Sequence, residues 1–278
     1  MLKIKKKRII LNNDIKSLSK NQFYKFLKRS IFLGHILIFK NNYFILRIIN
    51  NINQKYNLIL DKKHKSKFKE KLVNSQILLK NDMNIVKIFK SFLNSLGFFD
   101  HQTFIDKITL RYTPPKETES IGLLKPLASH RDTWGSNILE QINWWFPIED
   151  TSFENSIYII ENKFSSFVKN NSSDWDFMKF KKNSKKFLSS PISENKFEIK
   201  TENILKLKKG DLLCFSGHHL HGSFQGSRHR INLETRTVSI NDKNKFIIPD
   251  KKDNFAKKRK SKWFRNIYNK SLLSTTNY

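Results

Sequence analysis

The sequence GDLLCFSGHHLHGSF, residues 210–224, contains the pattern that decides the fold. A Gly-Asp turn precedes an apolar run at residues 212–215, and a second run follows at residues 219–224. Short apolar runs bounded by turn residues are typical of β-strands. Runs of the same kind occupy residues 107–112, 140–146, 156–160, 204–207 and 230–240. Because no helical periodicity separates them, the sequence predicts an antiparallel sandwich or barrel rather than βαβ units.

The first hundred residues follow a helical period instead. Asp14 can cap a helix that runs to about Ser30, and the pair Asn81-Asp82 can cap a second helix that ends at Gly97. Apolar residues recur at helical spacing in both segments: Leu18, Phe23, Phe26 and Leu27 in the first, and Val86, Phe89, Leu93 and Leu96 in the second. We therefore expect residues 1–98 to form a mostly helical support region.

Three segments fit neither pattern. Residues 62–71 are nearly all charged and are expected to form a solvated helix face. Residues 161–200 form a long polar insertion, and loops of that length are usually functional or disordered. Residues 249–278 form a very basic tail. The strand-rich domain is therefore expected at residues 99–248, with the insertion inside it.

The charge of the chain allows two kinds of partner. The 278 residues carry a formal net charge of +29, from 53 Lys and Arg against 24 Asp and Glu. Only ten of these basic residues are Arg, and the charge is spread along the whole chain, so a solvated surface is favoured over nucleic-acid binding. An anionic substrate would benefit from such a field. With 38% hydrophobic and 13% aromatic residues, the chain can form a packed core, which excludes disorder throughout.

The single cysteine and the short apolar runs of the chain indicate in which cellular compartment the protein is expected. A single cysteine, Cys214, excludes an intramolecular disulfide framework and fits a reducing compartment. The apolar run after the basic start, residues 9–11, is too short for a signal peptide. The longest apolar stretch, residues 31–39, is about half the length of a membrane span. We expect a cytoplasmic protein without a membrane span.

His130 and Asp132 are the first candidate metal ligands. In an extended segment, residues two apart point to the same side, so this imidazole and this carboxylate can reach one metal ion. Taken alone, the tripeptide is a weak signal, because an exposed His beside a helix-capping Asp explains it as well.

A histidine cluster, His218, His219 and His221, follows the strand at residues 212–215. His219 and His221 are expected on one face of the next strand, with His218 on the other face. One of these side chains can supply a third metal ligand. The structural alternative is a His-rich loop with arginines at its rim.

Arginines gather near both motifs. Arg111, Arg131, Arg228, Arg230 and Arg236 lie on the expected strands or beside the histidines, although the chain takes most of its positive charge from Lys. Arginine binds a carboxylate through a planar fork that lysine cannot reproduce. Arginine that is retained in a Lys-rich chain therefore indicates a geometric role, without showing which arginine has it.

Two histidines and one carboxylate with open coordination positions form the facial triad of non-haem Fe(II) oxygenases. The segments 130–134 (HRDTW), 141–147 (QINWWFP) and 210–230 resemble the phytanoyl-CoA dioxygenase-like branch of the 2-oxoglutarate/Fe(II) oxygenases. The resemblance covers roughly residues 105–238, under half of the chain. It implies a double-stranded β-helix, that is, a jelly-roll barrel with the metal at its mouth.

The resemblance also implies roles for single residues. His130 and Asp132 match the proximal metal ligands, and His221 matches the distal ligand because a small residue follows it. Arg230 matches the arginine that binds the distal carboxylate of 2-oxoglutarate. The spacing from His219 to Arg230 fits the family better than the spacing from His221, so His219 remains the alternative ligand.

The activity implied by the resemblance requires Fe(II), 2-oxoglutarate and O2, and releases succinate and CO2. It hydroxylates a small or carrier-linked molecule, and the presence of Asp132 favours hydroxylation over halogenation. Arg236 is the second candidate for the co-substrate carboxylate, and Arg111 is a further candidate for a contact with co-substrate or substrate. A cupin-type metal barrel needs no carboxylate-binding arginine, so Arg230 distinguishes that alternative.

Overall fold

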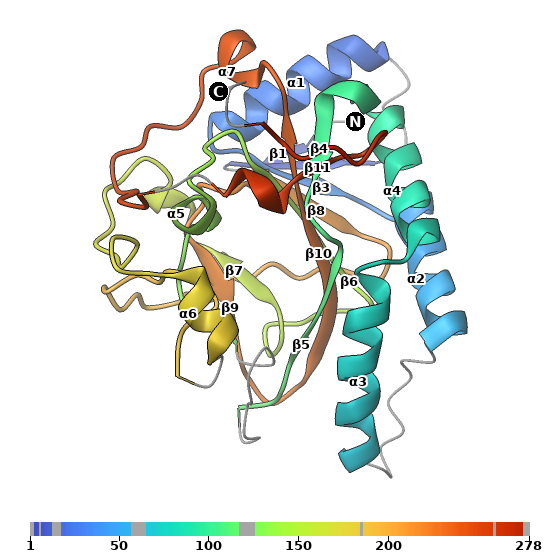
Figure 1. Cartoon of the computed structure of the whole chain (residues 1–278), viewed down its shortest axis with the longest axis vertical. Coiled ribbons are helices and arrows are strands. Elements are labelled where there is room, and N and C mark those ends of the chain that lie inside the picture. The colour runs from blue at the N-terminus through green and yellow to red at the C-terminus, as the bar shows by residue number, and fades with distance from the viewer. Residues whose placement is uncertain are drawn as a thin grey trace.

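The computed structural model describes residues 3–5, 7–12, 18–56, 65–116, 126–183, 186–257 and 260–274 (Figure 1). Its strands are β1 (Lys3–Lys5), β2 (Arg8–Leu11), β3 (Ile36–Phe39), β4 (Thr103–Ile105), β5 (Thr109–Thr113), β6 (Ile142–Pro147), β7 (Ile157–Ile159), β8 (Leu212–Ser216), β9 (His221–Ser223), β10 (Arg230–Ser239) and β11 (Arg265–Asn266). Its α-helices are α1 (Lys20–Phe32), α2 (Tyr43–Tyr56), α3 (Lys65–Leu79), α4 (Met83–Ser95), α5 (Asp132–Ser136), α6 (Phe177–Lys182) and α7 (Asp242–Lys245). Short 3-10 helices are η2 (Asp100–Gln102), η4 (Glu161–Lys163), η5 (Thr201–Asn203) and η6 (Ser261–Trp263).

The described strands form one large sheet and one small sheet. The large sheet has the order β1-β2-β3-β8-β6-β10-β4-β11, with β5 also paired to β10, and the small sheet consists of β7 and β9. The strands β4 and β5 pair with successive parts of β10 and are interrupted at residues 106–108. Every strand pair formed after residue 99 is antiparallel, as the sequence predicted.

The two faces of the large sheet have different surroundings. Trp144 of β6 and Leu233 of β10 belong to the main hydrophobic core, together with side chains of α1, α2 and α4. Because side chains alternate along a strand, Asn143 and Arg230 lie on the opposite face. That face is turned toward the small sheet, where Ile157 packs in a second core with residues of β3, β6 and β8. Figure 1 shows the helices α2, α3 and α4 on one side of the large sheet and β7 and β9 on the other.

Helix α1 begins one turn later than predicted. Ser19 is its N-cap and forms a capping box with Gln22, whereas the expected cap, Asp14, lies outside the described residues. Phe23 and Leu27 are buried as expected. Leu18 precedes the helix and is exposed, so it does not belong to the buried face.

The expected helical region also contributes strands to the large sheet. These strands were not predicted from the sequence. β2 and β3 form a parallel pair joined by α1, and β3 pairs with β8. All four side chains of β3 are buried, so its sequence shows no alternation and resembles any short apolar run. A βαβ connection therefore exists at one side of a sheet that is otherwise antiparallel.

Helix α4 agrees with its prediction. Asp82 is the N-cap, and its side chain accepts hydrogen bonds from the backbone of Asn84 and Ile85. Gly97 follows the helix with φ +88°, a left-handed conformation that suits a residue without a Cβ atom. The charged segment 62–71 overlaps the start of α3. Residues 62–64 and the side chains of residues 65–69 lie outside the part of the chain that the structure describes, so the expected solvated face stays a prediction.

One predicted strand is wrong. Residues 204–207 form only an isolated bridge between Ile204 and Tyr158. The backbone N–H of Leu207 donates to the hydroxyl of Thr151 instead of to a neighbouring strand, which ends a regular ladder there. No helix in the described part of the chain is long and apolar enough to cross a membrane.

Candidate metal centre

His130 and His221 face each other across an isolated antiparallel bridge. The backbone N–H of His130 donates to the carbonyl of His221 at 2.8 Å, and that of His221 donates to the carbonyl of His130 at 3.0 Å. His130 precedes α5, and His221 is the first residue of β9. The two imidazole centroids are therefore only 4.3 Å apart.

Backbone carbonyls fix the orientation of both rings. The Nδ1 atom of His130 lies 2.8 Å from the carbonyl of Ala128, and that of His221 lies 2.9 Å from the carbonyl of His219. Nδ1 must carry the proton in these hydrogen bonds, so Nε2 of each ring has a free lone pair. Burial lowers the pKa of His130 to about 4, so its ring is neutral at pH 7 and able to bind a metal ion.

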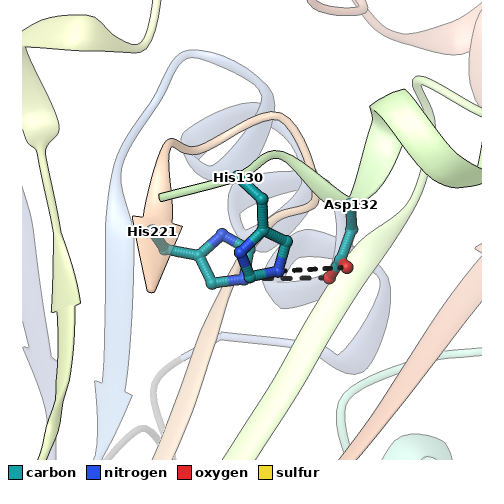
Figure 2. Close-up of side chains that lie close together, drawn as sticks. All are labelled: His130, Asp132 and His221. Carbon is teal, nitrogen blue, oxygen red and sulfur yellow. Dashed lines mark ion pairs between the residues drawn. The ribbon is translucent and has the colours of Figure 1, made fainter. Parts of the chain in front are cut away.

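Asp132 completes the group from the first turn of α5. The intervening residue, Arg131, is extended (φ −114°, ψ 132°), and the helix begins only at Asp132. The extended Arg131 brings both neighbouring side chains to one side, as expected for residues two apart in an extended segment. The Asp132 carboxylate lies 3.7 Å from Nε2 of His130 and 3.9 Å from Nε2 of His221 (Figure 2).

Two partners hold the Asp132 carboxylate. Asn143 of β6 donates to Oδ2 at 2.6 Å, and Arg236 of β10 lies 3.8 Å from Oδ1. Burial would raise the pKa of Asp132, but Arg236, the two histidines and Asn143 together lower it. The carboxylate is consequently ionised at neutral pH, as a metal ligand must be.

The three donor atoms fit a divalent metal ion. One donor from each of His130, Asp132 and His221 lies within 4.8 Å of the others. This separation is wider than that of donor atoms bound to one metal ion at about 2.0–2.2 Å. Binding one ion therefore requires the three side chains to move closer together. Two imidazoles and one carboxylate leave coordination positions open, which is the donor set of a non-haem Fe(II) site.

His219 does not reach this centre. It lies in the turn between β8 and β9, so the expected shared strand face with His221 is wrong. Its Nδ1 lies 3.2 Å from the carbonyl of Ser216, and its Nε2 lies 3.2 Å from the carbonyl of Gly34. The geometry therefore brings His221, and not His219, to His130 and Asp132. The connection between β9 and β10 is short, which accounts for the spacing from His221 to Arg230.

A cavity of about 1130 Å³ contains this centre and all three candidate co-substrate arginines, Arg111, Arg230 and Arg236. Arg111 is paired with Glu234, with 2.7 Å between Nε and Oε1. Arg236 is paired with Asp106 and also approaches Asp132. Both of these guanidinium groups already have carboxylate partners.

Arg230 differs from the other two arginines. It is 5% exposed, and its donors meet neutral oxygens of Asn232, Asn155, Thr113 and Ser223 at 2.9–3.3 Å. In the described part of the chain, no carboxylate lies within salt-bridge distance of it. Burial lowers its pKa to about 10, so it remains charged at neutral pH. A buried cation without a carboxylate is costly, and an anionic ligand would offset that cost.

Two supporting roles were missed, although Arg131 was noted in the sequence among the arginines that indicate a geometric role. Arg131 is fully buried and donates to the carbonyls of Phe164, His218, Lys163 and Ser166, while its Nε lies 3.1 Å from Asp253. It thus joins the metal motif to the insertion and to the tail. Asn143 was missed as well, and a lone amide in the apolar run of residues 142–146 is the signal that marks it.

Comparisons with known proteins found no matching family model and no matching curated protein. Among solved structures, the chain resembles the epimerase SnoN in complex with Fe3+, alpha ketoglutarate and nogalamycin RO, at 12% identity and a TM-score of 0.37, over 55% of this chain and 56% of that one. It also resembles EvdO2 from Micromonospora carbonacea var. aurantiaca complexed with 2-oxoglutarate, at 9% identity and a TM-score of 0.39, over 58% and 62%. The carbocyclase SnoK matches at 12% identity and a TM-score of 0.33, over 56% and 55%.

The chain spans less than two thirds of the length of each of these structures. Identities of 9–12% and TM-scores of 0.33–0.39 identify neither a reaction nor a substrate. The assignment of a function must come from the side chains of this chain.

Proposed function

We propose that this protein is an Fe(II)- and 2-oxoglutarate-dependent dioxygenase of the phytanoyl-CoA dioxygenase-like branch, with a jelly-roll core. The observation that carries the proposal is the pairing of two features in one cavity. One is the group of His130, Asp132 and His221, with both Nε2 atoms free, and the other is Arg230, a buried cation without a carboxylate partner. A generic metal-binding barrel would need the first feature but not the second.

Arg230 is the residue that binds the co-substrate. Four of its five N–H donors meet neutral oxygens of Asn232, Asn155, Thr113 and Ser223, so its fork binds the distal carboxylate of 2-oxoglutarate by exchanging some of these contacts for charge-assisted hydrogen bonds. Ser223 lies on β9, two residues after His221, so the carboxylate-binding group is tied to the strand that holds a metal ligand. The spacing between metal and carboxylate is thereby set by one strand.

Asn143 and Arg236 act on Asp132. They hold its carboxylate ionised and oriented, and the carbonyls of Ala128 and His219 hold the two imidazoles in the metal-binding tautomer. Iron bound to these three residues would supply the activation of O2 that couples decarboxylation of 2-oxoglutarate to oxidation of the substrate. Because the carboxylate ligand is present, hydroxylation is the proposed outcome rather than halogenation.

Succinate formation tests the proposal. Protein purified without oxygen is mixed with Fe(II), 2-oxoglutarate and O2, and succinate is measured without added substrate, since slow uncoupled turnover fixes the reaction class. We expect succinate to accumulate only when all three components are present, and a His221→Gln variant to produce none. A protein that binds Fe(II) at this site but never consumes 2-oxoglutarate would be a metal-binding barrel of another kind.

A further inference from the structure

The polar insertion and the basic tail, whose roles the sequence did not reveal, meet at the metal-containing cavity. Trp175 and Phe177 come from the insertion, at the start of α6, and Trp263 ends η6 in the tail. All three rings line the cavity. The ring centroids of Phe177 and Trp263 are 5.1 Å apart, and that of Trp175 lies 6.0 Å from Phe177 and 6.4 Å from Trp263. We call these three residues the aromatic wall.

The aromatic wall is not a closed core. Its three rings are partly buried, and Trp263 also packs against a small core cluster, whereas Phe180 on the same helix as Phe177 is buried, as are Trp134, Trp144 and Trp145 elsewhere. A hydrogen bond nevertheless holds one of the rings in place, because Nε1 of Trp175 donates to the carbonyl of Leu188 at 3.0 Å. A Cβ atom added at Gly135 would stand 3.8 Å from the Trp175 ring, so this ring lies against the helix that carries Asp132. Each ring also has a cation within 6.0 Å of its centroid: Lys260 at Trp175, Lys181 at Phe177 and Arg236 at Trp263. A molecule that enters the cavity therefore meets aromatic rings together with positive charge.

Arg236 connects the aromatic wall to the metal centre. Its guanidinium carbon lies 5.3 Å from the centroid of Trp263, and its Nη1 lies 3.8 Å from the Asp132 carboxylate. The wall thus begins one side chain away from a candidate metal ligand. A molecule that packs against Trp263 would therefore lie close to the metal centre.

The cavity also has an excess of positive charge. Nine Lys and Arg residues line it against three Asp and Glu residues, and those acids are already paired with Arg111 and Arg236. Lys181 and Lys262 stand next to the wall, and the ammonium of Lys181 lies 5.0 Å from the Phe177 centroid. Within the described residues, neither lysine has a carboxylate within 4.0 Å. Arg230 is reserved for the co-substrate, so these lysines are available for a second anionic group.

We infer, building on the proposed function, that the substrate is a planar ring system that carries an anionic group such as a phosphate, sulfate or carboxylate. The ring packs among Trp175, Phe177 and Trp263, whose planes are inclined to one another by 43–85°, because aromatic rings bind other rings through offset-stacked and edge-to-face contacts. The anionic group lies toward Lys181 and Lys262, where the excess positive charge stabilises it. An uncharged aliphatic chain would gain apolar contact with the rings, but neither ring–ring stacking nor an interaction with the lysines.

Calorimetric binding to the full-length protein tests this inference without iron or 2-oxoglutarate. The probes are 4-nitrophenyl phosphate, which has ring and charge, 4-nitrobenzyl alcohol, which has the ring alone, and cyclohexyl phosphate, which has the charge alone. We expect the first to bind at least ~10-fold more tightly than either of the others, since stacking of one ring is worth about 1–3 kcal/mol and about 1.4 kcal/mol is tenfold. Equal affinities for the three probes would overturn the inference.

Matched variants locate the binding. Lys181→Met should weaken 4-nitrophenyl phosphate at least ~3-fold and leave 4-nitrobenzyl alcohol unchanged. Lys179→Met, which removes an exposed lysine from the same helix that does not line the cavity, should change neither. Trp263→Leu should weaken both aromatic probes, while Trp263→Phe should largely restore them. If Lys179→Met and Lys181→Met have the same effect, the anion does not bind here and the inference is wrong.

The two hypotheses fail separately. Probe binding as expected, in a protein that never forms succinate, would refute the dioxygenase and leave the ligand class intact. Succinate formation in a protein that binds no aromatic anion would support the dioxygenase and refute the ligand class.

Discussion

His130 and His221 exchange two backbone hydrogen bonds, of 2.8 and 3.0 Å, and this exchange sets the spacing of their imidazole rings. The main chain, rather than a metal ion, therefore positions two of the three candidate ligands. Such preorganisation is what precise metal sites require, because ligands that are already in place lose little conformational entropy on binding.

Replacing the distal histidine should abolish metal binding. We expect His221→Gln to weaken Fe(II) binding by more than ~100-fold, since the loss of an outer hydrogen bond alone typically costs 10–100-fold. His219→Gln should keep the affinity within ~3-fold of the parent, because both ring nitrogens of His219 face backbone carbonyls. Anaerobic titration, with Co(II) as a spectroscopic substitute, measures both. Comparable losses in the two variants would contradict the assignment of His221.

Removing the partner of the carboxylate should have an intermediate effect. Asn143→Ala deletes the 2.6 Å hydrogen bond to Asp132, so Fe(II) affinity should fall by roughly 10–100-fold while the fold persists. Thr109→Ala is the control, because Thr109 lines the same cavity and its hydroxyl donates to the carbonyl of Lys107. An unchanged affinity in Asn143→Ala would mean that Arg236 alone orients the carboxylate.

The co-substrate arginine should be sensitive to geometry and not only to charge. Arg230→Lys retains the charge but loses the fork, so the 2-oxoglutarate concentration for half-maximal turnover should rise at least ~10-fold. Fe(II) affinity should change little. Arg228→Lys is the matched control, because Arg228 is exposed and lies two residues earlier. Equal effects of both substitutions would refute the role of Arg230, and a selective effect of Arg236→Lys would transfer that role to Arg236.

The buried pair of Arg131 and Asp253 should make a large contribution to stability. Asp253→Asn leaves the guanidinium buried and uncompensated, so the free energy of unfolding should fall by about 3–5 kcal/mol. Asp250→Asn, in the same segment but exposed, should have almost no effect. Urea denaturation measures both variants. A small loss in Asp253→Asn would show that the carbonyl acceptors of Arg131 suffice without the carboxylate.

Two other histidines should make the stability depend on pH. Burial lowers the pKa of His218 to about 2 and that of His219 to about 3, whereas both titrate near 6.5 in an unfolded chain. As the pH falls below about 6.5, the unfolded chain binds protons that the folded chain does not. Each histidine should therefore lower the free energy of unfolding by up to about 1.4 kcal/mol per pH unit between pH 6 and 4. Above pH 6.5 this stabilisation is fully present.

Urea unfolding at pH 7, 6 and 5, with a chelator present, measures this dependence. His219→Gln removes one titrating group and should make the decline shallower. An identical slope in the parent and in the variant would show that other groups cause it.

The sequence revealed most of the candidate centre because its residues lie in short local motifs. His130 and Asp132 are separated by one extended residue, and His221 follows a recognisable strand and turn. The choice between His219 and His221 was harder, because both fit a strand that would begin at residue 219. The strand begins at His221 instead, since residues 217–219 form a turn.

Long-range relationships had no local signal. Arg131 was suspected of a geometric role, but nothing in the sequence links it to Asp253 in the tail. Trp175 and Trp263 lie in segments without a regular period, so their meeting over the cavity depends on tertiary packing alone. The sequence of β3 does not alternate between apolar and polar residues, because both faces of this strand are covered.

The pairing of β3 with β8 also affects how the chain must fold. Leu37 and Cys214 are adjacent in the sheet but lie about 180 residues apart in the sequence. Translation adds roughly 5–20 residues per second, so β3 leaves the ribosome on the order of ten seconds before its partner exists. During that time the apolar strand Ile36–Phe39 presents an unpaired edge, which is a hazard for aggregation. This segment is therefore a place where a nascent chain of this protein needs protection from aggregation, such as a chaperone provides.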